Sequence, residues 1–144
     1  MPGKPVVLGI ATLAGRKIPV AGIPGYPVSA FMAMEEFVLP LLAAWQDREV
    51  PQRESLTVYP CNPLPSRPGM EERLRVKLGV VDGKAMAVPL PRGAGTVTSL
   101  SRADALITIP AESEGLDQGQ AVKAQLLRPQ SQINGALLAI GRCW

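Results

Sequence analysis

The segment Arg73-Leu74-Arg75-Val76-Lys77-Leu78-Gly79-Val80 decides the fold of the second half of the chain. Its apolar residues alternate with basic residues and a glycine, which is the period of two expected for a half-buried strand. Asp82-Gly83 follows as a strong hairpin-turn signal, and Ala85–Leu90 supplies the returning strand. We therefore predict a β-hairpin whose basic side chains share one face.

Further short apolar segments lie on both sides of this hairpin. Between them the chain has a loop at Pro91–Gly95, an acidic turn region at Glu112–Gly119 and a strand-ending Pro129. Several short strands with Gly- and Pro-rich turns are typical of a small all-β barrel or sandwich, and we predict a barrel domain over residues 54–128. Its additional strands are expected at Leu56–Cys61, Thr96–Ser101, Asp104–Pro110 and Gln120–Leu127.

Residues 1–50 have a different pattern. Pro5–Ile10 is a valine-rich run bounded by glycine, which predicts a buried strand. Arg16–Ile23 predicts a second strand after the turn Ala14-Gly15. A Pro-Gly-Tyr-Pro turn at 24–27 then leads into a helix, because proline is well tolerated in a first helical turn. We expect this region to be an α/β fragment, strands plus one helix.

The helix is predicted to run from Pro27 to about Gln46. Pro40 should kink or break it, because proline lacks an N–H group and its ring clashes with the preceding turn. Two glutamates, at 35 and 36, interrupt the apolar stretch Val28–Trp45, so we do not expect a membrane span. Three-to-four spacing predicts one apolar stripe, made of Phe31, Met34, Val38, Leu41, Leu42 and Trp45.

The composition excludes several kinds of chemistry. The 144 residues carry a formal net charge of +3 and contain no histidine, which excludes Ser-His-Asp and Cys-His triads and His-ligated zinc or iron. Cys61 and Cys143 form no CxxC pair, so a reducing compartment is favoured over a zinc site or a disulfide framework. Met1–Pro5 lacks the plan of a signal peptide. Aromatic residues make up only 4%, so the core must be aliphatic.

Positive charge is concentrated in the middle of the chain. Residues 66–102 contain seven basic and three acidic side chains, whereas residues 1–54 are balanced. This excess favours a surface that attracts an anion, with an ordinary solvated strand face as the alternative. Nucleic acid is not the expected partner, because aromatic side chains for base stacking do not interleave with the basic ones.

Three features are candidates for binding that anion. In Pro24-Gly25-Tyr26-Pro27-Val28-Ser29 a stiff turn enters a helix, whose first N–H groups and partial positive charge attract anions. Gly25 lets a ligand approach the backbone and Ser29 offers a hydroxyl, although an ordinary strand-to-helix turn has the same pattern. Lys4, between two prolines, points at an oxyanion or into solvent. Arg75 suits bidentate phosphate binding.

The order of these features resembles the C-terminal part of the molybdopterin molybdotransferases, the MoeA-like proteins, with the gephyrin E domain as their eukaryotic relative. The resemblance extends over residues 2–127 and rests on an ordered set of motifs. Those motifs are Pro2–Pro5, Gly22–Ala30, Glu72–Val76, Arg92–Leu100, Ala103–Leu106 and Glu114–Val122.

The resemblance implies a molybdenum cofactor biosynthesis enzyme that inserts molybdate into adenylylated molybdopterin and releases AMP. It implies magnesium as the cation, molybdopterin as the small-molecule substrate, and a cytoplasmic homodimer. It also implies that the α/β part is a piece of a molybdopterin-binding-type domain, followed by the barrel. By this resemblance, Lys4 would match a lysine of the functional cleft, Pro24 and Pro27 the two prolines of the family's Pro-Gly-Asn-Pro turn, and Arg75 an arginine from the barrel. Replacing this arginine with alanine should then weaken anion binding and leave folding nearly unchanged.

Two positions depart from the family pattern. Tyr26 stands where the family usually has Asn, which caps a helix N-terminus better than tyrosine does. Ala94 stands where the family often has Ser, so one hydroxyl that would touch a ligand is missing.

The chain resembles only the last part of such an enzyme. A Gly-rich pterin-binding segment and clustered acidic metal ligands are expected upstream, so catalytic residues stay unassigned, and we predict no bound metal and no turnover for this chain alone. Residues 129–144 are interpreted as the start of a further domain, with a strand-like centre at Ala136–Ile140. The alternative function is a non-catalytic barrel that serves as an interaction or dimer-supporting module.

Overall fold

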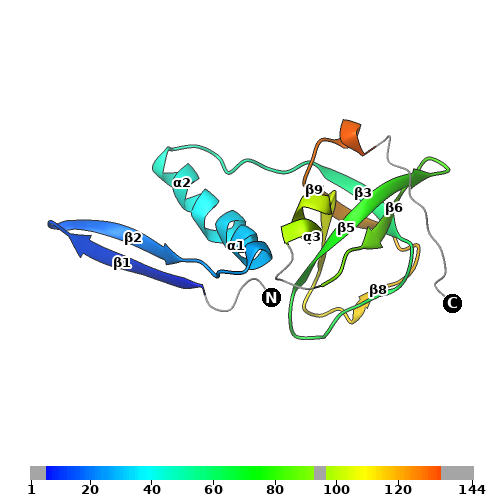
Figure 1. Ribbon diagram of the computed structural model, residues 1–144, viewed down its shortest axis with the longest axis horizontal. Helices are drawn as coiled ribbons and strands as arrows, with labels where there is room; N and C mark the ends of the chain where they lie inside the picture. The colour runs from blue at the N-terminus through cyan, green and yellow to red at the C-terminus, as the bar shows by residue number, and fades with distance from the viewer. Residues whose placement is uncertain (1–5, 93–96, 134–144) are drawn as a thin grey trace. The chain divides into compact units, whose positions relative to one another are not determined.

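The computed structural model describes residues 6–92 and 97–133 (Figure 1). These residues form two compact units, one ending at Gln52 and the other beginning at Arg53. The first contains a two-stranded sheet and a helical segment, and the second contains a closed β-barrel. Lys4, Ala94, Cys143 and the strand expected at Ala136–Ile140 lie outside the described residues.

The first unit begins with an antiparallel hairpin of β1 (Val7–Leu13) and β2 (Arg16–Gly22). Both turn residues, Ala14 and Gly15, have positive φ, as the primed turns of tight hairpins require. The predicted strands and turn are thus confirmed. The expected burial is wrong, because every residue of β1 is exposed. In the described part of the chain the sheet has only these two strands, too few to bury a strand.

The helical segment has three parts: α1 (Pro27–Ala33), the π-helical turn η1 (Met34–Val38) and α2 (Leu39–Trp45). Pro40 lies in the first turn of α2. The wide turn directly before it hydrogen-bonds the Leu39 N–H to the Met34 carbonyl, five residues back. The irregularity predicted at Pro40 is confirmed, and a π turn is one of the ordinary ways in which a helix adjusts to an interrupted bond ladder.

The π turn also changes which side of the helix is buried. The predicted stripe is wrong in part, because its members Met34, Leu42 and Trp45 are exposed, Trp45 by 60%. A π turn contains one residue more than an α turn, so side chains after it are displaced around the axis relative to an uninterrupted 3.6-residue period. The residues buried instead are Val28, Met32, Ala33 and Ala43.

By length and composition alone, the 19 residues Pro27–Trp45 are apolar enough to cross a membrane. A core helix of a soluble protein passes the same test, so this property is weak evidence. The expectation that the two glutamates exclude a membrane span therefore stays a prediction.

The second unit is a closed five-stranded barrel in the order β3-β6-β5-β7-β9, which confirms the predicted barrel. Its core is aliphatic, as expected from the composition, and includes Val58, Val76, Leu78, Ile107 and Ile109 with no exposed surface. The strands are β3 (Ser55–Pro60), β5 (Glu72–Val81), β6 (Lys84–Pro89), β7 (Ala105–Ile109) and β9 (Val122–Leu126).

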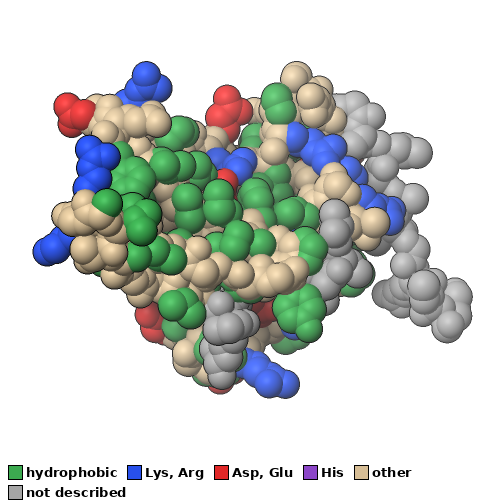
Figure 2. Space-filling view, turned by 60° about the vertical axis from the view of Figure 1, so that its left-hand side comes forward, with side chains coloured by type: hydrophobic (Ala, Val, Ile, Leu, Met, Phe, Trp, Pro, Cys, Tyr) green, Lys and Arg blue, Asp and Glu red, His purple; other side chains and the backbone are tan. Residues whose placement is uncertain are grey.

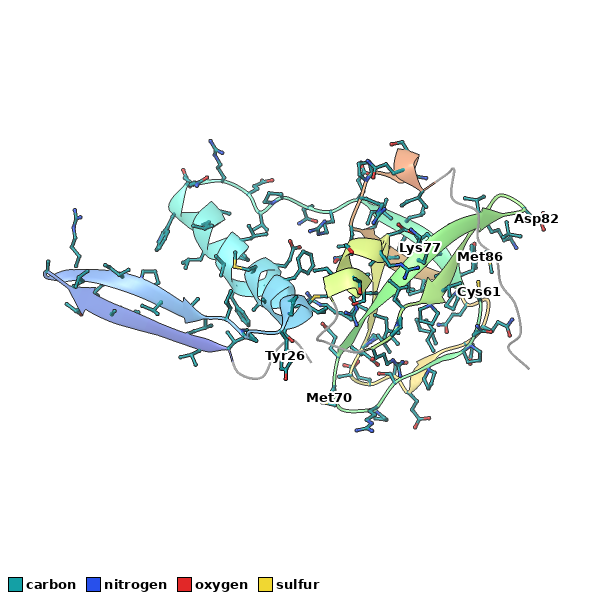
Figure 3. All side chains as sticks on the ribbon, in the orientation of Figure 1. Tyr26, Cys61, Met70, Lys77, Asp82 and Met86 are labelled. Atoms are coloured by element: carbon teal, nitrogen blue, oxygen red, sulfur yellow. The ribbon has the colours of Figure 1, made fainter. Side chains whose placement is uncertain are left out.

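The hairpin predicted from the alternating segment is the β5–β6 pair. Leu74, Val76 and Leu78 point inward and are buried, whereas Val80, at the end of the strand, is 44% exposed. Asp82 and Gly83 form the turn with positive φ at both positions, and Figure 3 shows Asp82 at the tip of the hairpin. The local pattern therefore determines both the pairing and its register.

Two elements of the barrel differ from the sequence prediction. Instead of the strand expected at Thr96–Ser101, the structure has the short helix α3 (Val97–Arg102). The acidic turn region contains β8 (Gly115–Leu116), which pairs with β4 (Leu64–Pro65). A Cβ atom on Gly115 would lie 2.3 Å from the Leu64 carbonyl oxygen, so the close approach of β4 requires glycine. Both elements depend on contacts distant in sequence, which local propensity does not contain.

After β9, the 3₁₀ turn η2 (Gln130–Gln132) leads to Ile133, which is 1% exposed and belongs to the barrel core. Ile133 thus packs with the barrel, whereas the sequence analysis interpreted residues 129–144 as the start of a further domain.

A buried carboxylate joins three strands of the barrel. Asp104 is 2% exposed, and its Oδ2 accepts a hydrogen bond of 2.9 Å from the Leu78 N–H on β5. Its Oδ1 pairs with Lys77 Nζ at 2.9 Å and with Arg128 Nε at 3.1 Å. Because every charge and lone pair that is buried without a partner costs free energy, this arrangement stabilises the barrel only while all its members are present.

Asp104→Asn should lower the free energy of unfolding by about 2–4 kcal/mol, because it leaves the two cations facing a neutral amide whose NH₂ group clashes with a donor. Urea unfolding of the full chain followed by circular dichroism measures this loss. The matched control is Asp82→Asn, which places Asn-Gly in an exposed turn that suits it and should change stability by less than about 0.5 kcal/mol. Equal effects of the two substitutions would show that the Asp104 contacts contribute nothing.

Candidate functional site

The turn between β2 and α1 has the geometry of an open helix N-terminus. Pro24 is buried, Gly25 is exposed, and Pro27 is the first residue of α1. Tyr26 is the N-cap residue, with φ −78° and ψ 125°, and no side chain caps the helix. Figure 3 shows the Tyr26 side chain at the start of α1, and it is 62% exposed. Among the described residues, no side chain therefore accepts a hydrogen bond from the helix start.

The first hydrogen bond of the helix runs from the Ala30 N–H to the Tyr26 carbonyl at 2.8 Å. Proline at 27 has no N–H, so the N–H groups of Val28 and Ser29 are the donors at the helix start that neither the helix nor a cap uses. Ser29 itself is half-buried. Two adjacent donors at the positive end of a helix suit an oxyanion.

Gly25 gives this turn an open side. A Cβ atom built on Gly25 meets nothing within 4 Å among neighbouring atoms. The glycine is therefore not required by packing, and a ligand can approach the backbone there at close range.

Arg75 lies in the other unit, and its environment differs from the prediction. The side chain projects from β5 but is only 5% exposed. Its Nη1 donates to Ser99 Oγ of α3 at 2.8 Å, and its Nη2 donates to the Pro91 carbonyl at 2.9 Å. Burial lowers the pKa of the guanidinium below its usual value. The solvated face considered for the basic strand is thus wrong for Arg75, whose donors hold α3 and the loop after β6.

The neighbouring basic residues of β5 have other partners. Arg73 pairs with Glu71 at 3.3 Å on the surface, and Lys77 pairs with buried Asp104. Arg92, which follows β6, is half-exposed and pairs with Glu72 at 3.1 Å. The basic residues that the sequence grouped as one anion-binding face are therefore used individually, in ion pairs and hydrogen bonds within the barrel.

The described residues contain no group of three or more Cys, Asp or Glu side chains that comes together in a way that could hold a metal ion. Cys61 is a buried free thiol at the end of β3, and burial raises its pKa. A raised pKa disfavours the thiolate, so Cys61 is not suited to act as a nucleophile.

Sequence reasoning missed Ser99, Asp104 and Arg128 as polar residues that organise the barrel. Ser99 lay in a predicted strand, and an isolated serine has no pattern that would predict a buried arginine partner. Asp104 offered a weak signal, since it is an acidic residue directly before an apolar strand in a basic region.

Comparison with known proteins relates the barrel to one family. Residues 61–127 match the family model described as the MoeA C-terminal region, domain IV. The chain is 26% identical over 111 residues to a molybdopterin molybdenumtransferase of Bacillus subtilis. It is 30% identical over 127 residues to a putative molybdopterin biosynthesis protein of Methanocaldococcus jannaschii.

Solved structures of proteins with the same kind of name also have a fold similar to that of this chain. A molybdopterin biosynthesis MoeA protein from Pyrococcus horikoshii superimposes with a TM-score of 0.65 and 34% identity over 89% of this chain. A molybdenum cofactor biosynthesis protein from Pyrococcus furiosus gives a TM-score of 0.57 and 29% identity over 71% of the chain.

The chain spans a limited part of these proteins. It matches 26% of the B. subtilis relative, 28% of the M. jannaschii relative and 30% of the P. horikoshii structure. The resemblance inferred from the ordered motifs is confirmed for this part.

Arg75→Ala should lower the free energy of unfolding by about 2–3 kcal/mol, because it leaves the Ser99 hydroxyl and the Pro91 carbonyl without their charged donor. Urea denaturation of the full chain measures the loss. Arg73→Ala on the same strand is the control, since its surface ion pair contributes at most about 1 kcal/mol. If Arg75→Ala were as mild as the control, the expectation of nearly unchanged folding would hold after all.

Tyr26→Asn should stabilise the start of α1 by about 0.5–1 kcal/mol, because the Asn side chain accepts the free N–H of Val28 or Ser29. Amide hydrogen exchange at residues 28–30 measures the change, with slower exchange expected in the variant. Tyr26→Ala provides the comparison without an acceptor, and a similar slowing in both variants would mean that capping is not the cause.

Proposed function

Since residues 61–127 belong to the family of MoeA C-terminal regions, we propose that the chain acts in molybdenum cofactor biosynthesis as part of a molybdopterin molybdotransferase. The reaction would insert molybdate into adenylylated molybdopterin and release AMP. The observation that carries this proposal is the closed barrel together with the structural likeness over 89% of the chain, a share too large for the barrel alone.

The turn at 24–29 supplies the chemistry that such substrates require. Molybdate is an oxyanion and molybdopterin carries a phosphate, and both are bound well by backbone N–H groups at a helix start. We assign this role to the N–H groups of Val28 and Ser29, to the Ser29 hydroxyl and to the open backbone at Gly25. Pro24 and Pro27 keep the turn stiff, so that its donors are preorganised for the ligand.

Lys4 and Arg75 have different places in this proposal. Lys4 would add a positive charge to the anion site, as the family resemblance implies. Arg75 acts as a positioning residue, because both terminal nitrogens of its guanidinium already donate to Ser99 and Pro91. It would hold α3 and the loop after β6 in place rather than contact the substrate.

Magnesium enters the proposal only as a property of the whole enzyme. The described residues offer no cluster of ligands for it, and no step is assigned to it here. The proposal further includes a homodimer in the cytoplasm with molybdopterin as its small-molecule partner. Because the chain matches about 26–30% of its relatives, we also propose that it has no turnover without the remaining part.

The test is a chimera in which the 144-residue chain replaces the segment that it matches in the B. subtilis relative. Purified chimera and isolated chain are each given adenylylated molybdopterin, molybdate and magnesium, and released AMP is quantified by chromatography. We expect AMP release that depends on molybdate from the chimera and none above background from the chain. A folded chimera without activity would instead favour the interaction module, and activity of the isolated chain would contradict its assignment as an incomplete part.

The site is tested by two glycine substitutions in the same chimera. Gly25→Val should lower AMP release at least about tenfold, because the side chain occupies the space through which a ligand reaches the backbone. Gly9→Val is the matched control, since a Cβ at Gly9 also meets nothing within 4 Å and the residue lies in an exposed strand. Equal activities of the two variants would remove the turn from the site.

A further inference from the structure

The ladder between β3 and β6 is the shortest in the closed barrel. These strands pair in parallel through only two residue pairs, Tyr59 with Met86 and Pro60 with Ala87. Residues 55–58 of β3 pair with β9 on their other side, and residues 84–85 of β6 pair with β5. The first four residues of β3 and the first two residues of β6 therefore have no backbone pair across this seam, and we call this unpaired stretch the opening.

A pocket of about 430 Å³ occupies this opening. Its floor is apolar and contains Leu56, Ala85 and Ile133, the last of which follows η2. A volume of this size is within the range of small-molecule sites, which typically combine apolar walls with a few polar groups. The remaining lining residues are Thr57, Tyr59, Val80, Gly83, Lys84 and Gln130.

The polar side chains at the rim have donors and acceptors to spare. Thr57, Tyr59, Lys84 and Gln130 form no side-chain hydrogen bond or ion pair with the part of the chain that the structure describes. Lys84 Nζ instead lies 5.6 Å from the centroid of the Tyr59 ring. This cation–π contact holds the ammonium group beside the pocket while its charge stays unpaired.

The charges around the pocket favour an anion. Among the described residues that line the pocket, Lys84 is the one that carries a charge, and Lys123 is the cross-strand neighbour of Thr57 on β9. Asp82 lies at the tip of the β5–β6 hairpin but does not line the pocket (Figure 3). Bringing a phosphate dianion against an apolar lining costs more desolvation than bringing a singly charged carboxylate, and one lysine compensates only one charge, so the lining favours the carboxylate.

We infer that this opening binds a small organic carboxylate with a flat apolar body. The apolar part would enter the pocket against Leu56, Ala85 and Ile133, and the carboxylate would remain at the rim beside Lys84. Thr57, Tyr59 and Gln130 provide hydrogen-bond donors around it. The inference uses only residues of the barrel and does not depend on the proposed function or on the turn at 24–29.

Binding is tested on the full chain with naphthalene-2-carboxylate as the probe, by methyl NMR titration. We expect chemical-shift changes centred on Leu56, Ala85 and Ile133, with a Kd below about 1 mM. The neutral probe naphthalene-2-carboxamide should bind at least threefold more weakly. Shift changes centred on Leu8 and Ile10 of the exposed hairpin, or no saturable binding, would overturn the inference.

Two pairs of variants separate the pocket from general surface effects. Val80→Trp fills the opening and should weaken binding at least tenfold, whereas Val81→Trp, at an adjacent residue of nearly equal exposure outside the lining, should change it less than twofold. Lys84→Met removes the charge and should weaken carboxylate binding at least threefold without affecting the amide probe. Lys123→Met is its control, and an equal loss in both lysine variants would show that long-range charge, not a site at Lys84, attracts the probe.

Discussion

The carboxylate of Asp104 is the contact on which the barrel depends most. Besides its ion pairs with Lys77 and Arg128, its backbone N–H donates to Val76 and its carbonyl accepts from Leu127, at 2.9 and 2.8 Å. A single residue thus links β5, the start of β7 and the end of β9. Because Arg128 also donates to the carbonyls of Ser101 and Ala103, the same network fixes the C-terminal end of α3.

Arg75 is the second polar link. Like Asp104, it is a buried charged side chain whose partners lie within the barrel. Both lie on the outward side of β5, where alternation of apolar and basic residues suggested a solvated face. Arg75 and Asp104 are nevertheless buried, so their charges must be paired or hydrogen-bonded. Arg75 therefore fastens α3 and the loop after β6, and Lys77 fastens Asp104 at the start of β7, so only part of the positive charge of β5 is available to a ligand.

The sequence predicted those elements whose cause is local. Alternation along residues 73–80, and the turns at 14–15 and 82–83, are properties of a few adjacent residues, and both hairpins are confirmed. The helix α3 is different, because its Ser99 is held by an arginine 24 positions away. The β4–β8 pair likewise joins segments far apart, and it is possible only because residue 115 lacks a side chain.

The hairpin β1–β2 shows that the sequence pattern also failed to predict burial correctly. Its valine, leucine and isoleucine residues are typical of a covered strand, yet Val7, Leu8, Ile10 and Leu13 are each more than half exposed. Hydrophobic side chains occupy much of the surface that Figure 2 shows. Sequence hydrophobicity predicts that a strand needs cover, and it does not identify which segment supplies that cover.

The turn at 24–29 explains why a missing cap is compatible with function. A side chain that caps a helix accepts the same N–H groups that an oxyanion would need, so capping and anion binding compete for Val28 and Ser29. With Tyr26 at the cap position, the geometry of the turn rests on the buried Pro24 and on Pro27, neither of which uses these donors. In the proposed anion site, Tyr26 would therefore lower the stability of the helix start and, for the same reason, leave its donors open to a ligand.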